Sequence, residues 1–513
     1  YMSKKLIAVI DIGSLVARLK VFELSTKGKP KEVETVRKYT SIGTRSFIEG
    51  AIPSNQIDEI CDCLNEFGMK CREYKVSRVF CVATSALRES SNRDVVLERV
   101  RIRTGYRIDI LDNSMERYYH NMSIRETMPD FTSIIANGTM ILDIGAGSMQ
   151  ATVYDKSEFV FSQNTVLGSL RISGLLSDIE DRTTHYEDVL EEFIAQDMDD
   201  YHAVEPKGIT YQNLIAFGGE MGFIKLLAGQ KSRKDCILSK KQFLSVYEYL
   251  LKTRPTDLTL NHSIPSNIAP LLLPTALIIR NMLEYTGLET VYLPNASLSE
   301  GIVYNYAYKY MEYPTVMNPD IDIIFAARNI SKRYKCDKKH TEFVEKTALM
   351  LFDCTKKYNG LSERDRQLLQ LSSILHEVGK YVHSKSHNDA AHMLIKYSEI
   401  VGINSDELDI IGLVVRLYPK DDAYDDPYYR NLPAEKKVII SKLTAMLRLA
   451  DALDSSHRQK VKKLKATLDK DSMALVCECS SDMSFEEWSF ERRSKLFIEV
   501  LGINPQLKIR RQR

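Results

Sequence analysis

The pattern of apolar and polar residues over the first 300 positions predicts alternating strands and helices. Short apolar runs predict strands at residues 6–10, 17–22, 79–83 and 214–217. Between these runs, apolar residues recur at helical spacing after Ser54, and Asn92 is expected to cap a helix that ends at Gly105. Strands that alternate with helices are typical of an α/β fold.

The pattern changes near residue 313, where the strand signals stop. Helical periodicity continues from about residue 321 to residue 460, with a predicted surface loop at residues 418–433. Short strands follow, then an amphipathic helix over residues 488–500, and residues 508–513 are expected to be a solvated end. The chain is therefore predicted to have four parts, at residues 1–128, 129–312, 313–460 and 461–513.

One internal repeat changes this picture. The sequence IAVIDIGS near the N-terminus recurs as ILDIGAGS, which places Asp11 and Asp143 132 residues apart. A third apolar strand leads into Gly218 and Gly219. A strand that ends in Asp-x-Gly presents backbone N–H groups that suit phosphate oxygens, and its aspartate can hold Mg²⁺. The repeat therefore predicts two copies of one α/β unit, each with a phosphate-binding turn.

Three further segments accompany these turns: VATSALRESSN at residues 82–92, LGSLR at 167–171 and NASLSEG at 295–301. Together they resemble the signatures of the exopolyphosphatase/guanosine-pentaphosphate phosphatase (Ppx/GppA) family, within the actin/sugar-kinase/Hsp70 superfamily. The helical part resembles the HD-like domain of the longer members. The resemblance implies two actin-like (ribonuclease H-like) α/β domains, an all-α HD-like domain and a small α+β C-terminal domain.

The resemblance also implies roles for individual residues. Glu116 corresponds to the catalytic general base that activates water, and Arg88 corresponds to a phosphate-binding arginine that takes part in catalysis. Asp143 and Asp11 are the implied ligands of Mg²⁺ or Mn²⁺, with Gln150 as a lesser candidate. The implied phosphate-binding residues, besides Arg88, are Gly13, Ser14, Gly145, Gly147, Ser148, Gly218 and Gly219.

The leading functional hypothesis is a phosphoanhydride hydrolase. It releases terminal phosphate from inorganic polyphosphate, or the 5′ γ-phosphate of guanosine pentaphosphate, by Mg²⁺-assisted attack of water. The expected partners are polyphosphate or guanosine penta- and tetraphosphate, with no membrane and no specific nucleic acid. Homodimerisation is a further expectation of the family resemblance.

Several residues depart from the family signatures. Leu15 and Val16 replace two hydrogen-bonding residues of the first turn, Met115 replaces the first glutamate of a pair, and Gln150 and Glu220 change the charge of the second and third turns. Each lost charge-assisted contact costs about 1.5–3 kcal/mol. The second hypothesis is therefore a catalytically weakened or inactive sensor or scaffold that binds polyphosphate or guanosine tetra- and pentaphosphate. A sugar-kinase function is disfavoured, because no sugar-binding motif is visible.

The helical part carries a second set of candidate residues. His340, His376 and Asp451 occupy places that match a metal-binding HD site, but Glu377 replaces the expected aspartate. A phosphohydrolase that acts through these residues is a third hypothesis. A helical packing domain is the favoured interpretation.

Composition adds few constraints. The 513 residues include 70 Lys and Arg against 69 Asp and Glu, for a net charge of +1, which disfavours a protein whose whole surface binds nucleic acid. Nine cysteines without a C-x-x-C pair predict reduced thiols, and no apolar run is long enough for a membrane span. The N-terminus leads directly into a strand instead of a signal peptide, so the cytoplasm is the expected location. The basic residues at 231–241 are interpreted as a solvated face, with a polyphosphate track as the alternative.

Overall fold

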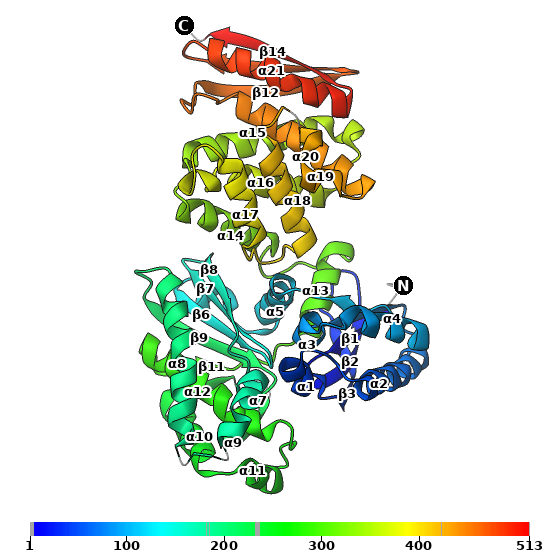
Figure 1. Cartoon of the computed structure of the whole chain (residues 1–513), viewed down its shortest axis with the longest axis vertical. Coiled ribbons are helices and arrows are strands. Elements are labelled where there is room, and N and C mark those ends of the chain that lie inside the picture. The colour runs from blue at the N-terminus through cyan, green and yellow to red at the C-terminus, as the bar shows by residue number, and fades with distance from the viewer. Residues whose placement is uncertain (1–4, 181, 184, 231–235, 422, 512–513) are drawn as a thin grey trace. The chain divides into compact units, whose positions relative to one another are not determined.

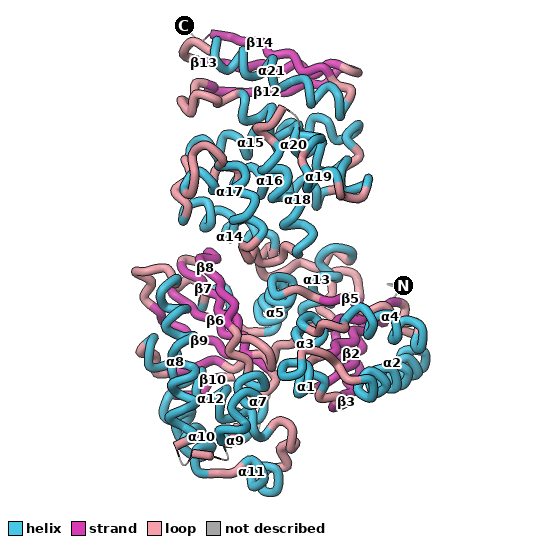
Figure 2. Tube along the Cα trace, viewed as in Figure 1, coloured by secondary structure: helices cyan, strands magenta, loops and turns pink. Residues whose placement is uncertain are grey.

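The computed structural model describes residues 5–180, 182–183, 185–230, 236–421 and 423–511, so most of the predicted basic run, at 231–235, lies outside the described residues. Contacts divide the chain into two compact units, Tyr1–Asp322 and Ile323–Arg513. The first unit contains two mixed sheets flanked by helices, whereas in the second the described strands belong to the C-terminal part (Figures 1 and 2). The predicted division into four parts stays a prediction. No helix among the described residues is both long and apolar enough to cross a membrane.

The first sheet of the first unit has the strand order β3-β2-β1-β4-β5. Its strands are β1 (Lys5–Ile12), β2 (Val16–Leu24), β3 (Lys31–Tyr39), β4 (Arg78–Ala83) and β5 (Asp109–Ile110). The helices of this region are α1 (Ile42–Glu49), α2 (Ser54–Glu73), α3 (Ser85–Glu89) and α4 (Arg93–Thr104). Strands β1, β2 and β3 are antiparallel neighbours, and β4 runs parallel to β1.

The second sheet has the order β10-β11-β9-β6-β7-β8. Its strands are β6 (Gly138–Ile144), β7 (Met149–Asp155), β8 (Glu158–Thr165), β9 (Tyr211–Gly218), β10 (Ile237–Ser239) and β11 (Thr290–Tyr292). The helices of this region are α6 (Phe131–Ile134), α7 (Ser169–Glu180), α8 (Tyr186–Val204), α9 (Met221–Leu227), α10 (Lys240–Lys252), α11 (Pro255–His262), η1 (Ala269–Leu271) and α12 (Leu272–Thr286).

The two sheets confirm the repeat that the sequence predicts. Strands β8-β7-β6-β9-β11 follow the same order as β3-β2-β1-β4-β5. The first hairpins also share their register, because Asp11 is paired with Arg18 and Asp143 is paired with Gln150, with 132 residues between equivalent positions. Each aspartate therefore lies two residues before its turn, in a sheet of the same topology.

Two crossing helices, α5 (Asn113–Thr127) and α13 (Leu298–Tyr310), connect the first sheet with the candidate site. Leu298 and Ile302 of α13 share an apolar core with Ile7 of β1. At Gly301, a Cβ atom would lie 1.8 Å from the backbone oxygen of Tyr119 in α5. Only glycine permits the two helices to approach this closely, and the contact fixes the helix that carries Glu116.

The helix at residues 93–104 differs in one detail from the sequence prediction. Gly105 ends it with φ 77°, as predicted. Asn92 occupies the N-cap position, but its side chain makes no capping hydrogen bond. Its amide instead accepts from the backbone N–H of Ile52 at 3.0 Å and donates to the Ile52 carbonyl at 2.9 Å. A tertiary contact therefore replaces the local cap.

The second unit begins with helices, as predicted from the periodicity. They are α14 (Asp320–Arg333, which begins in the first unit), α15 (Lys338–Asn359), α16 (Glu363–Leu375), η2 (Val378–Tyr381), α17 (His387–Lys396), α18 (Ser405–Leu417), η3 (Ala423–Asp425), α19 (Pro427–Arg430) and α20 (Ala434–Ala452). The predicted surface loop at 418–433 is wrong in part, because Asp426 caps α19 and binds Arg416 and is itself buried.

The C-terminal elements are β12 (Val461–Asp469), β13 (Ser472–Cys479), α21 (Ser484–Leu501) and β14 (Asn504–Arg511). The prediction of a solvated end is correct for the side chains of Lys508, Arg510 and Arg511, which are exposed, but the backbone of residues 508–511 belongs to β14, which runs parallel to β13 and completes a three-stranded sheet. Ile509 and Leu507 pack against a small core that includes Cys477. Leu507 and Ile509 alternate with the charged residues Lys508 and Arg510, and such alternation is typical of a strand. The basic residues made this pattern easy to miss in the sequence.

We expect Gly301→Ala to destabilise the first unit by about 3 kcal/mol, because the added methyl group meets backbone that has no free rotamer. Gly222→Ala in α9 is the matched control, since a Cβ there meets nothing within 4 Å, and alanine favours a helix by up to about 1 kcal/mol. Urea unfolding followed by circular dichroism measures both changes. Equal midpoints for the two variants would show that the helix crossing is not tight.

Candidate phosphate and metal site

The site is built on the two Asp-x-Gly turns that follow β1 and β6. In each turn the glycine N–H closes a tight loop: Gly13 donates to the Val16 carbonyl at 3.1 Å, and Gly145 donates to the Ser148 carbonyl at 2.9 Å. Both turns therefore have the same closure. The predicted residues Ser14 and Ser148 lie within these loops.

The carbonyl oxygens of both turns are already used by the segments that follow them. Gly43 donates to the Ser14 carbonyl, and Ser169 donates to the Gly145 carbonyl. In contrast, no described residue accepts a hydrogen bond from the backbone N–H groups of Ser14, Leu15, Ala146 or Gly147. Each turn thus keeps two donors available for an anion, the arrangement that suits phosphate oxygens.

Ser85, at the start of α3, brings the two turns together. Its hydroxyl lies 3.1 Å from the hydroxyl of Ser14. A Cβ atom at Gly147 would lie 2.9 Å from the same oxygen. Gly168 packs equally closely on the second turn, because its Cβ would lie 2.2 Å from the carbonyl carbon of Gly147. Both turns and the start of α3 therefore form one compact arrangement.

Arg88 and Glu116, the predicted phosphate ligand and general base, contact each other directly. Nη1 of Arg88 donates to Glu116 Oε2 at 2.9 Å and to the Leu111 carbonyl at 2.7 Å. Both side chains are largely buried. Among the described residues, these contacts of the guanidinium use Nη1 alone, so its Nε and Nη2 groups remain for a phosphate while Nη1 holds the carboxylate in place.

His120, one helical turn after Glu116 on α5, is a site residue that the sequence analysis missed. Its Nδ1 lies 2.5 Å from Oδ2 of Asp143. Burial by itself disfavours the protonated imidazole, but the charge and hydrogen bond of Asp143, with Glu116 and Asp11 nearby, raise the pKa of His120 to about 9. The protonated imidazole of His120 therefore lies against the carboxylate of Asp143, which is the main candidate ligand for Mg²⁺. Its place four residues after Glu116 was the one available sequence signal.

The other predicted metal ligands differ in their surroundings. Burial raises the pKa of Asp11, although the charge of Arg18 opposes this change. The amide oxygen of Gln150 accepts a hydrogen bond from Nε of the buried Arg117 at 3.1 Å. The Gln150 oxygen that could contact a metal ion is thus bound to the guanidinium of Arg117. Asp11, Asp143 and Glu116 provide the carboxylate oxygens that Mg²⁺ prefers, and they lie in one electrostatic cluster, so the residues fit this ion if Asp143 exchanges His120 for it.

The third predicted turn lies beside the second, because Ile144 is paired with Gly218. A Cβ at Gly218, where φ is 153°, would lie 2.2 Å from the Ile144 carbonyl oxygen. A Cβ at Gly219 would meet nothing within 4 Å. The Glu220 carboxylate accepts a hydrogen bond from Ser169 at 2.7 Å, and burial raises its pKa. The carboxylate of Glu220 is therefore held by the first residue of α7, beside the second turn.

The second set of candidate residues, in the helical part of the chain, also comes together. Nε2 of His340 lies 3.2 Å from Nε2 of His376 and 3.1 Å from Oδ1 of Asp451, and 3.8 Å from Oε1 of Glu377. Burial opposes protonation of His340, but hydrogen bonds to its carboxylate neighbours raise its pKa to about 9. Burial lowers the pKa of His376 to about 4.

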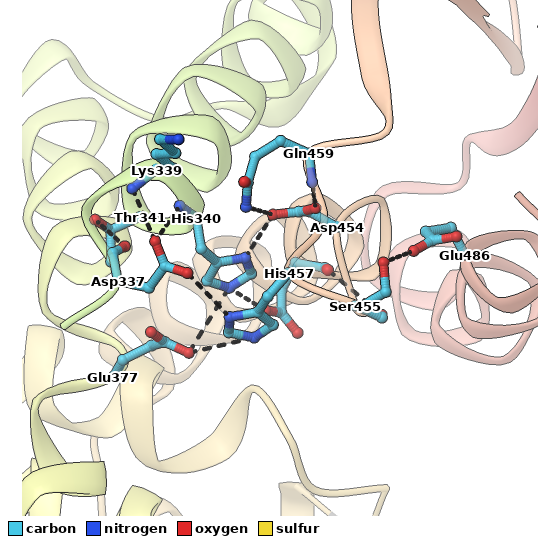
Figure 3. Close-up of polar contacts among 12 residues, drawn as sticks. Asp337, Lys339, His340, Thr341, Glu377, Asp454, Ser455, His457, Gln459 and Glu486 are labelled. Atoms are coloured by element: carbon cyan, nitrogen blue, oxygen red, sulfur yellow. Dashed lines mark hydrogen bonds and ion pairs between the residues drawn. The ribbon is translucent and has the colours of Figure 1, made fainter. Parts of the chain in front are cut away.

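Two further residues complete this cluster, and the sequence analysis did not assign them to it (Figure 3). Asp454 binds Nδ1 of His340 at 2.9 Å, and His457 stacks on the His340 ring with 3.7 Å between the ring centroids. Asp454 follows Asp451 by three residues, so both carboxylates face one helix side at the end of α20. That spacing was visible in the sequence.

Comparison with known proteins identifies the family. A family model described as the Ppx/GppA phosphatase family matches residues 23–310, and one for its domain III matches residues 325–491. The chain belongs to the Ppx/GppA phosphatase family. This result confirms the resemblance and supports a phosphatase-type hydrolase.

The relatives of this Ppx/GppA chain carry two kinds of name. A guanosine-5′-triphosphate,3′-diphosphate pyrophosphatase of Photobacterium profundum is 22% identical over 468 residues, which are 88% of this chain and 87% of the relative. Exopolyphosphatase 1 of Mycobacterium leprae is 28% identical over 144 residues, 28% of this chain and 41% of the relative.

Solved structures confirm the fold of the first unit. The crystal structure of an exopolyphosphatase from Cytophaga hutchinsonii superposes with a TM-score of 0.51 and 18% identity, covering 60% of this chain and 98% of that chain. The actin-like α/β fold predicted from the sequence is therefore confirmed, together with the helical region and the small C-terminal sheet.

The raised pKa of His120 predicts a pH-dependent contribution to stability. Its pKa in the folded protein lies above the ordinary value of 6.5. The stabilisation by protonated His120 is therefore fully present below pH 6.5 and is lost as the pH rises through about 9. We expect His120→Gln to destabilise the first unit at pH 6 by up to roughly 3 kcal/mol, and far less at pH 9.5.

Hydrogen exchange of peptides from α5 measures this effect, because the single tryptophan, Trp488, lies in the second unit. The control is His185→Gln, whose side chain is 75% exposed. A loss of stability in His120→Gln that is equal at both pH values would contradict the charge of His120.

Proposed function

We propose that this Ppx/GppA chain is a phosphoanhydride hydrolase that removes terminal phosphate from inorganic polyphosphate or from the 5′ end of guanosine pentaphosphate. One observation carries the proposal: Ser85 joins two turns with available N–H donors, and Arg88, on the same short helix, holds Glu116. Anion donors and a positioned carboxylate are the two parts that phosphate hydrolysis requires. The names of the two relatives support both substrates, and the choice between them belongs to the proposal.

In this proposal the residues divide the chemistry between them. The N–H groups of the two turns and the outer N–H groups of Arg88 bind phosphate oxygens and keep the reacting phosphorus in place. Glu116 accepts a proton from the attacking water, and Arg88 orients its carboxylate. Asp143 and Asp11 would hold Mg²⁺, or Mn²⁺ in its place, and that ion supplies charge neutralisation for the phosphates. The cytoplasmic location and the homodimer predicted from the sequence stay predictions.

A second function, binding without turnover, is favoured by two specific contacts. His120 engages Asp143, the principal candidate ligand of Mg²⁺, and Gln150 is engaged by Arg117. Both contacts reduce the negative charge that would hold a metal ion. A weakened or inactive protein that senses polyphosphate or guanosine tetra- and pentaphosphate would retain the phosphate-binding turns.

Phosphate release by the purified full chain tests the proposal, with Mg²⁺ and with each of the two substrates. Glu116→Gln keeps the size and the hydrogen-bonding capacity of the side chain beside Arg88 but removes the base. We expect this variant to release phosphate 10²–10⁴-fold more slowly.

The matched control is Glu98→Gln on α4, which alters an exposed glutamate paired with Arg101. This variant should retain the full rate. If Glu116→Gln also retains it, Glu116 is not the base. If the wild type releases no phosphate but binds either substrate in calorimetry, the sensor function is correct.

A further inference from the structure

The side chain of Leu15, in the first turn, joins the two parts of the first unit. We call the part built on the sheet β3-β2-β1-β4-β5 the first lobe, and the part built on the sheet β10-β11-β9-β6-β7-β8 the second lobe. Leu15 lies between β1 and β2 of the first lobe, but it is 7% exposed and packs in the hydrophobic core of the second lobe. Among the described residues, the other buried members of that core lie between positions 140 and 293. The replacement of a hydrogen-bonding residue by Leu15 is therefore also a gain of apolar contact between the lobes.

Two further apolar side chains of the first lobe lie at the same interface. Val16, the next residue in the chain, and Phe47 of α1 both pack against the core of the second lobe. Phe47 also packs against the core of the first lobe, so its ring contacts both cores. A Cβ atom at Gly147, in the second turn, would lie 2.7 Å from Cζ of Phe47. The ring therefore fills the space directly beside that turn.

Helix α1 of the first lobe and helix α7 of the second lobe extend this interface. At Gly43 of α1, a Cβ atom would lie 3.0 Å from Cδ2 of Leu170 in α7. At Gly174 of α7, a Cβ atom would lie 3.4 Å from Cδ1 of Ile48 in α1. Glycine allows such close approach because it has no side chain. The contact between the lobes thus runs along both helices.

Arg171 of α7 adds polar contacts to the interface. Its Nε donates to the Gly147 carbonyl at 2.8 Å, and its guanidinium carbon lies 4.7 Å from the ring centroid of Phe47. Its Nη2 donates to the carboxylate of Glu89, at the end of α3 in the first lobe, at 2.5 Å. Both charged side chains are partly exposed, so salt screens this ion pair. The buried apolar contacts are therefore the larger contribution to the interface.

The same interface fills the space between the two turns. The hydroxyl of Ser85 lies 3.1 Å from the hydroxyl of Ser14 in the first turn. A Cβ atom at Gly147 in the second turn would lie 2.9 Å from the hydroxyl of Ser85 and 2.7 Å from the ring of Phe47. Ser85 and Phe47 thus occupy the room that a phosphate group bound by both turns would need.

We propose that Leu15, Val16 and Phe47 form an apolar lock that keeps the two lobes closed, and that a phosphate chain must open this lock to bind both turns. Burial of apolar surface between the lobes favours the closed arrangement before any anion arrives. An anion shifts this equilibrium only through a higher affinity for the open arrangement, and its observed affinity falls as that arrangement becomes rarer. The lock itself does not depend on the proposed function, whereas its opening by phosphate rests on that function.

Hydrogen exchange of the full chain tests the lock. Leu15→Ala removes most of an apolar side chain from the core of the second lobe and adds no polar group. We expect exchange to rise at least roughly tenfold in peptides of residues 42–49 and 166–176, which lie on the two sides of the interface. Unchanged exchange at residues 166–176 would overturn the lock, because a residue that serves only the first lobe has no reason to affect α7.

The matched control is Leu19→Ala. Leu19 of β2 is also a buried leucine, but it lies in the core of the first lobe. This variant should raise exchange within the first lobe and leave residues 166–176 unchanged. A rise there equal to that of Leu15→Ala would also contradict the lock. If Leu15→Ala does not fold, Leu15→Val takes its place and should give the same pattern to a smaller extent.

Calorimetric binding of tripolyphosphate tests the opening of the lock by phosphate. Glu116→Gln serves as the background, so that release of phosphate does not disturb the measurement. Addition of Leu15→Ala should tighten binding roughly tenfold, because the open arrangement becomes more populated. Addition of Leu19→Ala should leave the affinity unchanged. Equal or weaker binding with Leu15→Ala, or no binding by any of these proteins, would overturn the opening by phosphate.

The two measurements separate the lock from the proposed function. If the wild type releases phosphate but Leu15→Ala leaves exchange at residues 166–176 unchanged, the function stands and the lock is wrong. If the wild type neither releases phosphate nor binds a phosphate chain, but exchange rises as expected, the lock stands and the function is wrong.

Discussion

The candidate site depends on close approach of backbone to backbone at glycine. Gly168 lies against the second turn at Gly147, and Gly301 lies against the backbone of Tyr119 in α5. The first contact brings the N-terminus of α7 to the turn carbonyls, so the turn N–H groups remain available to an anion. The second fixes the helix that carries both Glu116 and His120. A side chain at either glycine would separate the elements whose proximity forms the site.

A second feature follows from this close packing, because the polar side chains of the site already pair with one another. Arg88 holds Glu116, His120 holds Asp143, and Arg117 donates to Gln150. A phosphate or a metal ion bound as proposed would therefore exchange partners with groups that already have hydrogen-bond partners. The exchange at Arg88 is easy, because a phosphate can use the outer N–H groups while Nη1 stays on the carboxylate. The exchange at Asp143 is harder, because a cation would have to displace the protonated imidazole of His120 from the carboxylate.

The sequence was sufficient for the fold and for the turns, and it failed where tertiary contacts decide. The 132-residue repeat identified both hairpins, because Asp-x-Gly after an apolar strand specifies a local turn. Arg88 and Glu116 were predicted as a pair of site residues through the family resemblance, and the structure brings them into contact. His120 was missed because its place four residues after Glu116 was its only local signal, and only the fold places it beside Asp143. Tertiary contacts also explain two other differences from the prediction. The Asn92 side chain bonds to the Ile52 backbone instead of capping its own helix, and β14 forms a strand because it pairs with β13.

The carboxylate contacts of His120 and of His340 hold the two imidazole rings in different ways. Nδ1 of His120 contacts the Asp143 carboxylate directly, and the carboxylates of Asp11 and Glu116 lie nearby. The imidazole thus uses one of the carboxylate oxygens that this group of residues offers. His340 has its Nδ1 fixed by Asp454 and directs Nε2 toward a second imidazole and a carboxylate. An imidazole whose Nδ1 is held in this way keeps a fixed ring orientation, whereas one that binds a candidate metal ligand directly would compete with a cation for that carboxylate. The first contact therefore ties α5 to the second turn, and the second joins α15 to the ends of α16 and α20.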